Sequence, residues 1–137
     1  MAWLATLVWP EHQDRRARLS AAIEVARAEP PVIVRGDLVD ELPRMVDEAS
    51  AYAPVVVFHS AVIAYLPEER REVFHDLMTG LVAGGRCHWV SNEGPRVLAR
   101  VTATGPEHPE DEHGFVLAVD GRAVGRTHGH GRSLLWH

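Results

Sequence analysis

The residues of this sequence best suited to acid–base chemistry are a histidine and a glutamate, His59 and Glu93. His59 directly follows the apolar run 55–58, and Glu93 follows two residues after the predicted strand 86–91. A histidine exchanges protons near neutral pH because its reference pKa is about 6.5. We expect His59, Ser60 and Glu93 to be catalytic, with His59 and Glu93 forming a proton-transfer pair.

Polar residues end three apolar runs of the chain. If these runs are parallel strands, their carboxyl ends share the sheet edge where open α/β sheets bind ligands. We therefore predict one cleft shared by Asp37, His59 and Glu93, open to a small molecule. Taken individually, Asp37 and Asn92 also suit turns, and Ser60 suits a helix cap. The polar residues are Arg35, Asp37, His59, Ser60, Ser91, Asn92 and Glu93.

Two further histidines, His128 and His130, have a spacing that suits metal binding on a strand. Side chains two residues apart in a strand point to the same face. The sequence indicates no third ligand, so a glycine-rich bend with exposed imidazoles is the competing interpretation. A metal-dependent hydrolase is therefore kept as an alternative function. Cys87 is expected to be a buried, inert thiol.

The run 55–58, Val-Val-Val-Phe, must position His59 and Ser60. It shows no alternation of apolar and polar residues, a pattern typical of a strand covered on both faces in a parallel sheet. We predict that Val55, Val57, Phe58 and Val90 are almost fully buried in neighbouring parallel strands.

The remaining pattern alternates helices with strands. An Asp120-Gly121 dipeptide between apolar runs then predicts a two-residue hairpin. We expect one domain over residues 1–137, with an α/β, three-layer build and a mainly parallel sheet that ends in an antiparallel hairpin. The predicted helices are 11–28, 40–51 and 67–81. The predicted strands are 32–34, 55–58, 86–91, 115–119, 122–127 and 134–136.

The bulk composition excludes some classes of partner. A net charge of −5 and a pI near 6.0 argue against nucleic-acid binding. No apolar stretch approaches the length of a membrane span. The single cysteine suits a reducing compartment, so we expect a cytoplasmic protein.

Several longer motifs resemble a prokaryotic family of uncharacterised proteins, a domain of unknown function. They are Trp9-Pro10-Glu11, Arg35-Gly36-Asp37-Leu38, Phe58-His59-Ser60-Ala61, Tyr65-Leu66-Pro67, the stretch from His88 to Pro95 and the stretch from His128 to Leu134. The order of elements resembles the second half of the class I S-adenosylmethionine-dependent methyltransferase fold, a Rossmann-like architecture. Longer family members carry an upstream half with a glycine-containing turn for the cofactor, and this chain lacks that pattern.

The resemblance implies roles for individual residues. Asp37 and Leu38 would face the cofactor, and His59 and Ser60 would face the reacting methyl group. Tyr65, Ser91 and Asn92 would contact the substrate. S-adenosylmethionine is implied by fold analogy only.

The lack of a nucleotide-binding turn favours an alternative function. The chain would then be a non-catalytic interaction module, or a subunit completed by a partner. We expect a homodimer, because the predicted strand 32–34 would be an open edge able to pair with another chain. Apolar turns at Trp3, Leu4, Leu7 and Val8 are expected at or near the contact.

Overall fold

The computed structural model describes residues 2–107, 114–129 and 131–137. The chain divides into two compact units, Met1–Arg35 and Gly36–His137. Each of the three predicted helices has a counterpart in these units, and Cys87 is buried as expected. The expectation of a single domain over residues 1–137 stays a prediction.

The N-terminal unit consists of two helices. They are α1 (Ala2–Thr6) and α2 (Gln13–Ala28), and α2 lies within the predicted helix 11–28. Leu19 and Ile23 of α2 are only half-buried, and none of the described side chains from 3 to 35 is buried. Among the described residues, no helix is both long and apolar enough to span a membrane.

The predicted strand 32–34 is wrong. These residues have no regular secondary structure, and Val32 and Ile33 are 90% and 85% exposed. A strand needs a neighbour to bond its backbone. Within the described part of the chain, no strand pairs with this segment, so β propensity alone is not sufficient.

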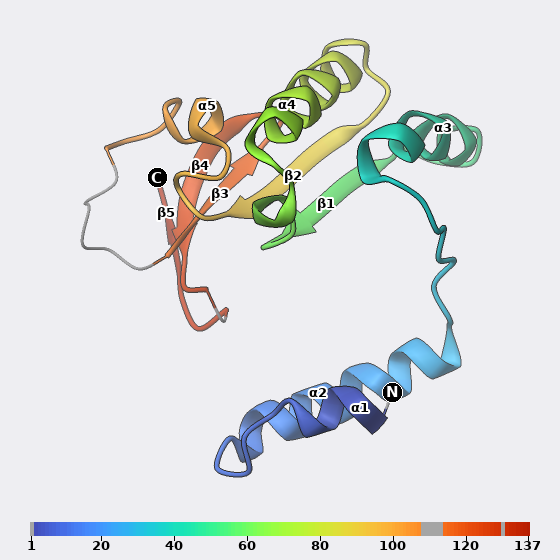
Figure 1. The fold of residues 1–137 in the computed structure, drawn as a ribbon, viewed down its shortest axis with the longest axis vertical. Coiled ribbons are helices and arrows are strands. Elements are labelled where there is room, and N and C mark those ends of the chain that lie inside the picture. The colour runs from blue at the N-terminus through green and yellow to red at the C-terminus, as the bar shows by residue number, and fades with distance from the viewer. Residues whose placement is uncertain (1, 108–113, 130) are drawn as a thin grey trace. The chain divides into compact units, whose positions relative to one another are not determined.

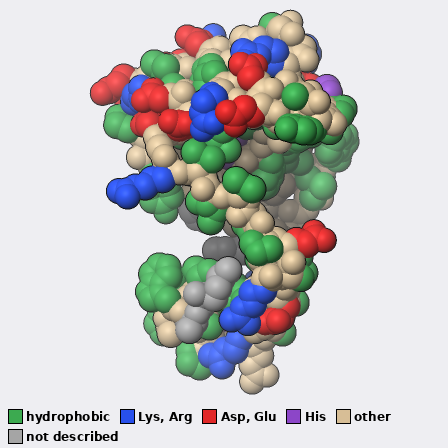
Figure 2. Space-filling model, turned by 90° about the vertical axis from the view of Figure 1, so that its right-hand side faces the viewer, with side chains coloured by type: hydrophobic (Ala, Val, Ile, Leu, Met, Phe, Trp, Pro, Cys, Tyr) green, Lys and Arg blue, Asp and Glu red, His purple; other side chains and the backbone are tan. Residues whose placement is uncertain are grey.

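The C-terminal unit contains two long helices with buried apolar residues. The helix α3 (Leu38–Ser50) begins where Asp37 Oδ1 accepts the N–H of Val39 at 2.9 Å. The helix α4 (Glu68–Ala83), predicted as 67–81, is followed by Gly84 and Gly85, and Gly85 has a left-handed φ of 65°. Two short helices, η1 (Ile63–Tyr65) and α5 (Ala99–Thr102), complete the helical layer. Acidic and basic side chains are interspersed on the surface of this unit (Figure 2).

The sheet has five strands in the order β1-β2-β3-β4-β5. Only β1 and β2 pair in parallel, and the other three pairings are antiparallel. The predicted mainly parallel sheet is therefore wrong, because 32–34 adds no strand and the later strands follow as antiparallel neighbours. The strands are β1 (Val56–Ser60), β2 (His88–Glu93), β3 (Phe115–Val119), β4 (Arg122–Thr127) and β5 (Leu134–Trp136).

The predicted three-layer build is also wrong, because the described helices of this unit lie on one side of the sheet (Figure 1). Burial therefore alternates along β1. Val57 is half-buried and packs against the core, whereas Val56 and Phe58 are 59% and 66% exposed. Val55 and Val90 are half-buried. The expected near-complete burial of Val55, Val57, Phe58 and Val90 is wrong, since an unbroken apolar run does not reveal whether a second helical layer exists.

The C-terminal hairpin confirms the sequence-based prediction. Asp120 and Gly121 have φ values of 50° and 78°. Two successive left-handed residues are what a type I′ turn between twisted strands requires. The carboxylate of Asp120 also accepts the N–H of Trp89 at 2.7 Å, which ties the turn to β2.

Candidate functional site

The structure brings His59 and Glu93 together at the ends of β1 and β2. His59 Nδ1 lies 2.8 Å from Glu93 Oε1, and both side chains are buried. The strand register explains the contact, because His59 lies beside Ser91 in the parallel pair and Glu93 follows on the same face of β2.

The indole of Trp89 fixes the tautomer of His59. Trp89 Nε1 lies 2.9 Å from His59 Nε2, and an indole N–H can only donate. Nε2 must therefore accept, so the proton is on Nδ1 and is donated to Glu93. Both ring nitrogens of His59 therefore have hydrogen-bond partners, which hold the imidazole in one orientation.

Glu93 also organises the loop that follows β1. Its Oε1 accepts the N–H groups of Val62 and Ile63 at 3.0 and 3.1 Å. Burial alone would raise the pKa of Glu93, but the hydrogen bonds from His59, Val62 and Ile63 outweigh it and lower the pKa. The other carboxylate oxygen, Oε2, is buried without a hydrogen-bond partner among the described residues. Glu93 is thus a charged anchor for this loop.

Ser60 does not join His59 and Glu93, because successive side chains of a strand point to opposite faces. Ser60 Oγ accepts from Asn92 Nδ2 at 3.1 Å, and Asn92 Oδ1 accepts from Thr127 Oγ1 at 2.7 Å. Because side chains alternate along a strand, the sequence alone already places the side chains of residues 59 and 60 on opposite faces of the sheet. The catalytic roles of His59, Ser60 and Glu93 stay predictions.

The residues predicted to contact a cofactor have contacts of their own. Asp37 caps α3 and pairs with Arg70 Nη2 at 2.5 Å. The N–H of Val39 and the Arg70 guanidinium hold the pKa of Asp37 below its usual value. Leu38 packs against the core. Both side chains are thus engaged within the fold and not arranged around an adenosyl group, and the assignment of Asp37 and Leu38 to the cofactor stays a prediction.

The predicted substrate contacts are dispersed. Tyr65 is 88% exposed in η1, Ser91 is buried on the helix side of β2, and Asn92 lies on the opposite face. Their role stays a prediction. No contact of Asp37 with His59 or Glu93 is found in the described part of the chain, so the shared cleft is likewise untested.

The metal alternative gains no support from the described residues. No group of three His, Cys, Asp or Glu side chains there is arranged to hold an ion. The backbone N–H of His128 donates to Ser133 O at 3.1 Å, and His130 lies outside the described residues. Cys87 is buried, and burial raises the pKa of its thiol, in agreement with an inert cysteine.

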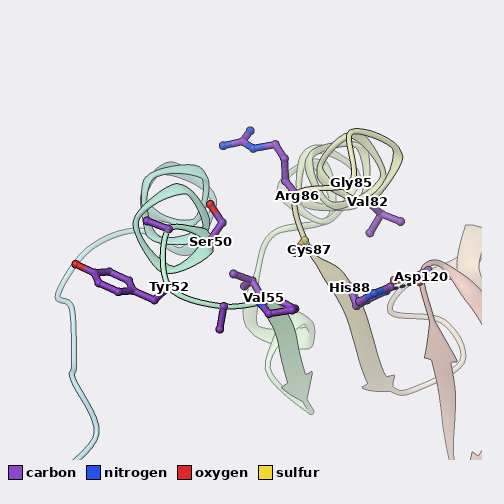
Figure 3. Close-up of a pocket in the computed structure, with 12 residues that line it drawn as sticks. Ser50, Tyr52, Val55, Val82, Gly85, Arg86, Cys87, His88 and Asp120 are labelled. Carbon is purple, nitrogen blue, oxygen red and sulfur yellow. Dashed lines mark hydrogen bonds and ion pairs between the residues drawn. The ribbon is translucent and has the colours of Figure 1, made fainter.

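A pocket lies at the opposite ends of β1 and β2, where both strands begin (Figure 3). Its volume is about 560 Å³, and it is lined by the end of α3, the end of α4 and Asp120. His88 Nδ1 lies 3.0 Å from Asp120 Oδ2, and the imidazole lowers the pKa of this carboxyl. The carboxylate of Asp120 holds the ring of His88 through Nδ1. The sequence predicts Asp120 only as a turn residue and gives no signal for this pair.

A third feature is the open edge of β1, defined by the backbone groups of Val56, Phe58 and Ser60. The N–H of His88 bonds Val55 O at 2.9 Å, and the N–H of Ala61 bonds Asn92 O at 3.1 Å. In a parallel ladder alternate residues bond one neighbour. Residues 55, 57, 59 and 61 therefore face β2, and the open edge faces away from it. In the described sheet β1 is a terminal strand.

One flank of α3 adjoins this open edge. Figures 1 and 3 show α3 on the side of β1 that faces away from β2. Arg86, at the end of α4, bonds Asp47 and Pro43 O, so that side of α3 faces α4. By helical spacing Met45 and Ala49 lie on the other flank, and both are exposed. We call Val56, Phe58, Met45 and Ala49, with the open edge, the β1 edge surface.

The fold and this surface define a two-layer α/β domain whose sheet ends in an unprotected strand. The chain matches a family described as uncharacterized protein conserved in bacteria (DUF2332) over residues 1–136. It therefore belongs to this bacterial family. Searches of curated proteins and of solved structures found no match.

Proposed function

We propose that the chain is an interaction module whose sheet is completed at the β1 edge surface by an extended strand of a partner polypeptide. The observation that carries the proposal is the open edge itself. Natural sheets protect such edges with charges, prolines or bulges. The segment Val56–Ser60 contains none of these, and two of its side chains are exposed and apolar.

The flank of α3 supports the same proposal. Val39, Leu42 and Val46 of its apolar stripe are buried, whereas Met45 and Ala49 remain exposed on the flank that faces away from α4. A strand placed next to β1 would cover these side chains on its helix side and Val56 and Phe58 on the other. Both apolar surfaces would leave water together.

The other functions expected from the sequence gain less support. Both nitrogens of His59 are engaged, so a proton-transfer role would require the contact with Trp89 to break. We assign the expected small-molecule ligand, as a proposal, to the pocket beside His88 and Asp120. The homodimer expected from the sequence is one form of this proposal, in which the added strand comes from a second copy of the chain.

Strand addition can be tested with a model peptide of alternating threonine and valine. We expect the peptide to slow amide hydrogen exchange at Val56, Phe58 and Ser60, measured by NMR over a range of protein dilutions. The matched control is the same peptide with alternate backbone nitrogens methylated, which removes the donors that pair with an edge. The amides of Val57 and His59 report on the existing β2 pairing.

Two results would overturn the proposal. One is exchange at the three edge amides that stays as fast as in unpaired peptides at every peptide and protein concentration. The other is equal protection by the methylated peptide, because this would show that backbone pairing is not involved.

A further inference from the structure

We infer that the strand completing the β1 edge surface is the segment Val32–Val34 of a second copy of this chain. This inference rests on the proposed function and names its partner. The segment is the most exposed apolar run described, with Val32 and Ile33 at 90% and 85% exposure. It has no regular secondary structure, so its backbone donors and acceptors are available for pairing.

The chemistry of the segment suits a strand with both faces covered. All three residues are β-branched, which favours extended backbone. Pro31 precedes the run, a position that a strand tolerates at its start. The three residues 32–34 would pair with part of β1, which is five residues long.

The two faces of the added strand would meet two different apolar surfaces. Alternating side chains place Ile33 on one face and Val32 and Val34 on the other. One face would contact Met45 and Ala49 of α3, and the other would lie beside Val56 and Phe58. An unbroken Val-Ile-Val run is what this position requires, since a charged residue on either face would be desolvated.

A symmetric pairing of β1 with β1 of a second copy is disfavoured by the position of α3. Figures 1 and 3 show α3 beyond β1 on the side away from β2. A whole second sheet would bring its own α3 and α4 into the same layer. The segment 32–34 belongs to no helix, since α2 ends at Ala28 and α3 begins at Leu38, and it adds a single strand rather than a second sheet.

The first test is the oligomeric state of the full chain. We expect a concentration-dependent dimer in sedimentation equilibrium at micromolar concentration. The variant Ile33→Asp should weaken dimerisation by at least about tenfold, because the added carboxylate would be desolvated in the pairing. The matched control is Val25→Asp, which changes a 69% exposed valine of α2 and should leave the dimer unchanged. Far-ultraviolet circular dichroism confirms that both variants keep their helices.

The second test places the contact. Chains carrying Ile33→Cys or Val32→Cys, one for each face of the added strand, are mixed with chains carrying Phe58→Cys or Val56→Cys and oxidised. We expect linked dimers between different variants, and no such product when Tyr52→Cys replaces the β1 variant. Every chain also carries the native Cys87, which is buried and contributes equally to all mixtures.

The outcomes separate the two proposals. A monomer at all concentrations, a dimer unaffected by Ile33→Asp, or links formed only within single chains would overturn the second copy as partner. If the threonine–valine peptide still protects the edge amides in that case, the proposed function stands. If the peptide also fails, both proposals are overturned.

Discussion

Trp89 determines where His59 carries its proton. The indole N–H occupies Nε2, and the Nδ1 proton is donated to Glu93. We predict that Trp89→Phe destabilises the domain by about 1–3 kcal/mol, since it leaves a buried acceptor unsatisfied. Urea unfolding measures this difference. The exposed Trp136→Phe is the control and should stay within about 0.5 kcal/mol of the parent. An Nε2–H tautomer in the imidazole ¹⁵N spectrum would contradict the argument.

The lowered pKa of Glu93 predicts a dependence of stability on acid. Its folded pKa lies below the ordinary value of 4.5, so the charged form is stabilised by folding. This contribution is fully present above about pH 4.5 and is lost as the pH falls through the folded pKa. We expect Glu93→Gln to be less stable than the parent at pH 7, with the gap narrowing below pH 4.5.

Urea unfolding at several pH values provides the measurement for Glu93. Glu29→Gln is a suitable control, because Glu29 is exposed and follows α2. A gap between Glu93→Gln and the parent that stays constant down to acid pH would show that the charge of Glu93 does not stabilise the fold.

At the scale of elements, neighbouring residues of β1 should respond differently to the same substitution. Val57 packs against the core, and Phe58 is 66% exposed on the open face. We predict that Val57→Asp costs several kcal/mol and prevents cooperative folding, because it buries an unpaired carboxylate. Phe58→Asp should leave the thermal midpoint of dilute protein nearly unchanged. Equal damage by both substitutions, measured by circular dichroism melting, would contradict a sheet covered on one face.

How far the sequence predicts the fold depends on how local the signal is. The turn at Asp120-Gly121 is determined by backbone conformations that few residues adopt, and this prediction is confirmed. The run 55–58 is correctly predicted to be extended. Its coverage depends on whether helices pack on both faces, and the order of residues along β1 carries no information about that.

The candidate site shows the same limit. Placing polar groups after strand ends predicts the neighbourhood of His59 and Glu93, and the parallel register then brings them into contact. The tautomer requires Trp89, whose approach depends on packing across β2. The open edge of β1 depends on a pairing that the segment 32–34 does not make in the described sheet, and propensity alone cannot reveal a missing neighbour.

At the scale of the whole molecule, the buried core belongs to one part of the chain. Its apolar members lie between Val39 and Ala118, within the unit Gly36–His137. None of the described side chains from 3 to 35 is buried, and an isolated helix of the length of α2 is marginal in water. The stability of the larger unit should therefore not require the smaller one.

We predict that a fragment of residues 36–137 folds cooperatively, with the thermal midpoint of the full chain. The comparison is made at high dilution, because a dimer would add concentration-dependent stability to the full chain. The fragment lacks Val32–Val34 and should sediment as a monomer at concentrations where the full chain associates. Calorimetry and sedimentation of the two proteins provide the measurements. A fragment that melts well below the dilute full chain would show that residues 1–35 contribute to the core, and a dimeric fragment would place the contact elsewhere than Val32–Val34.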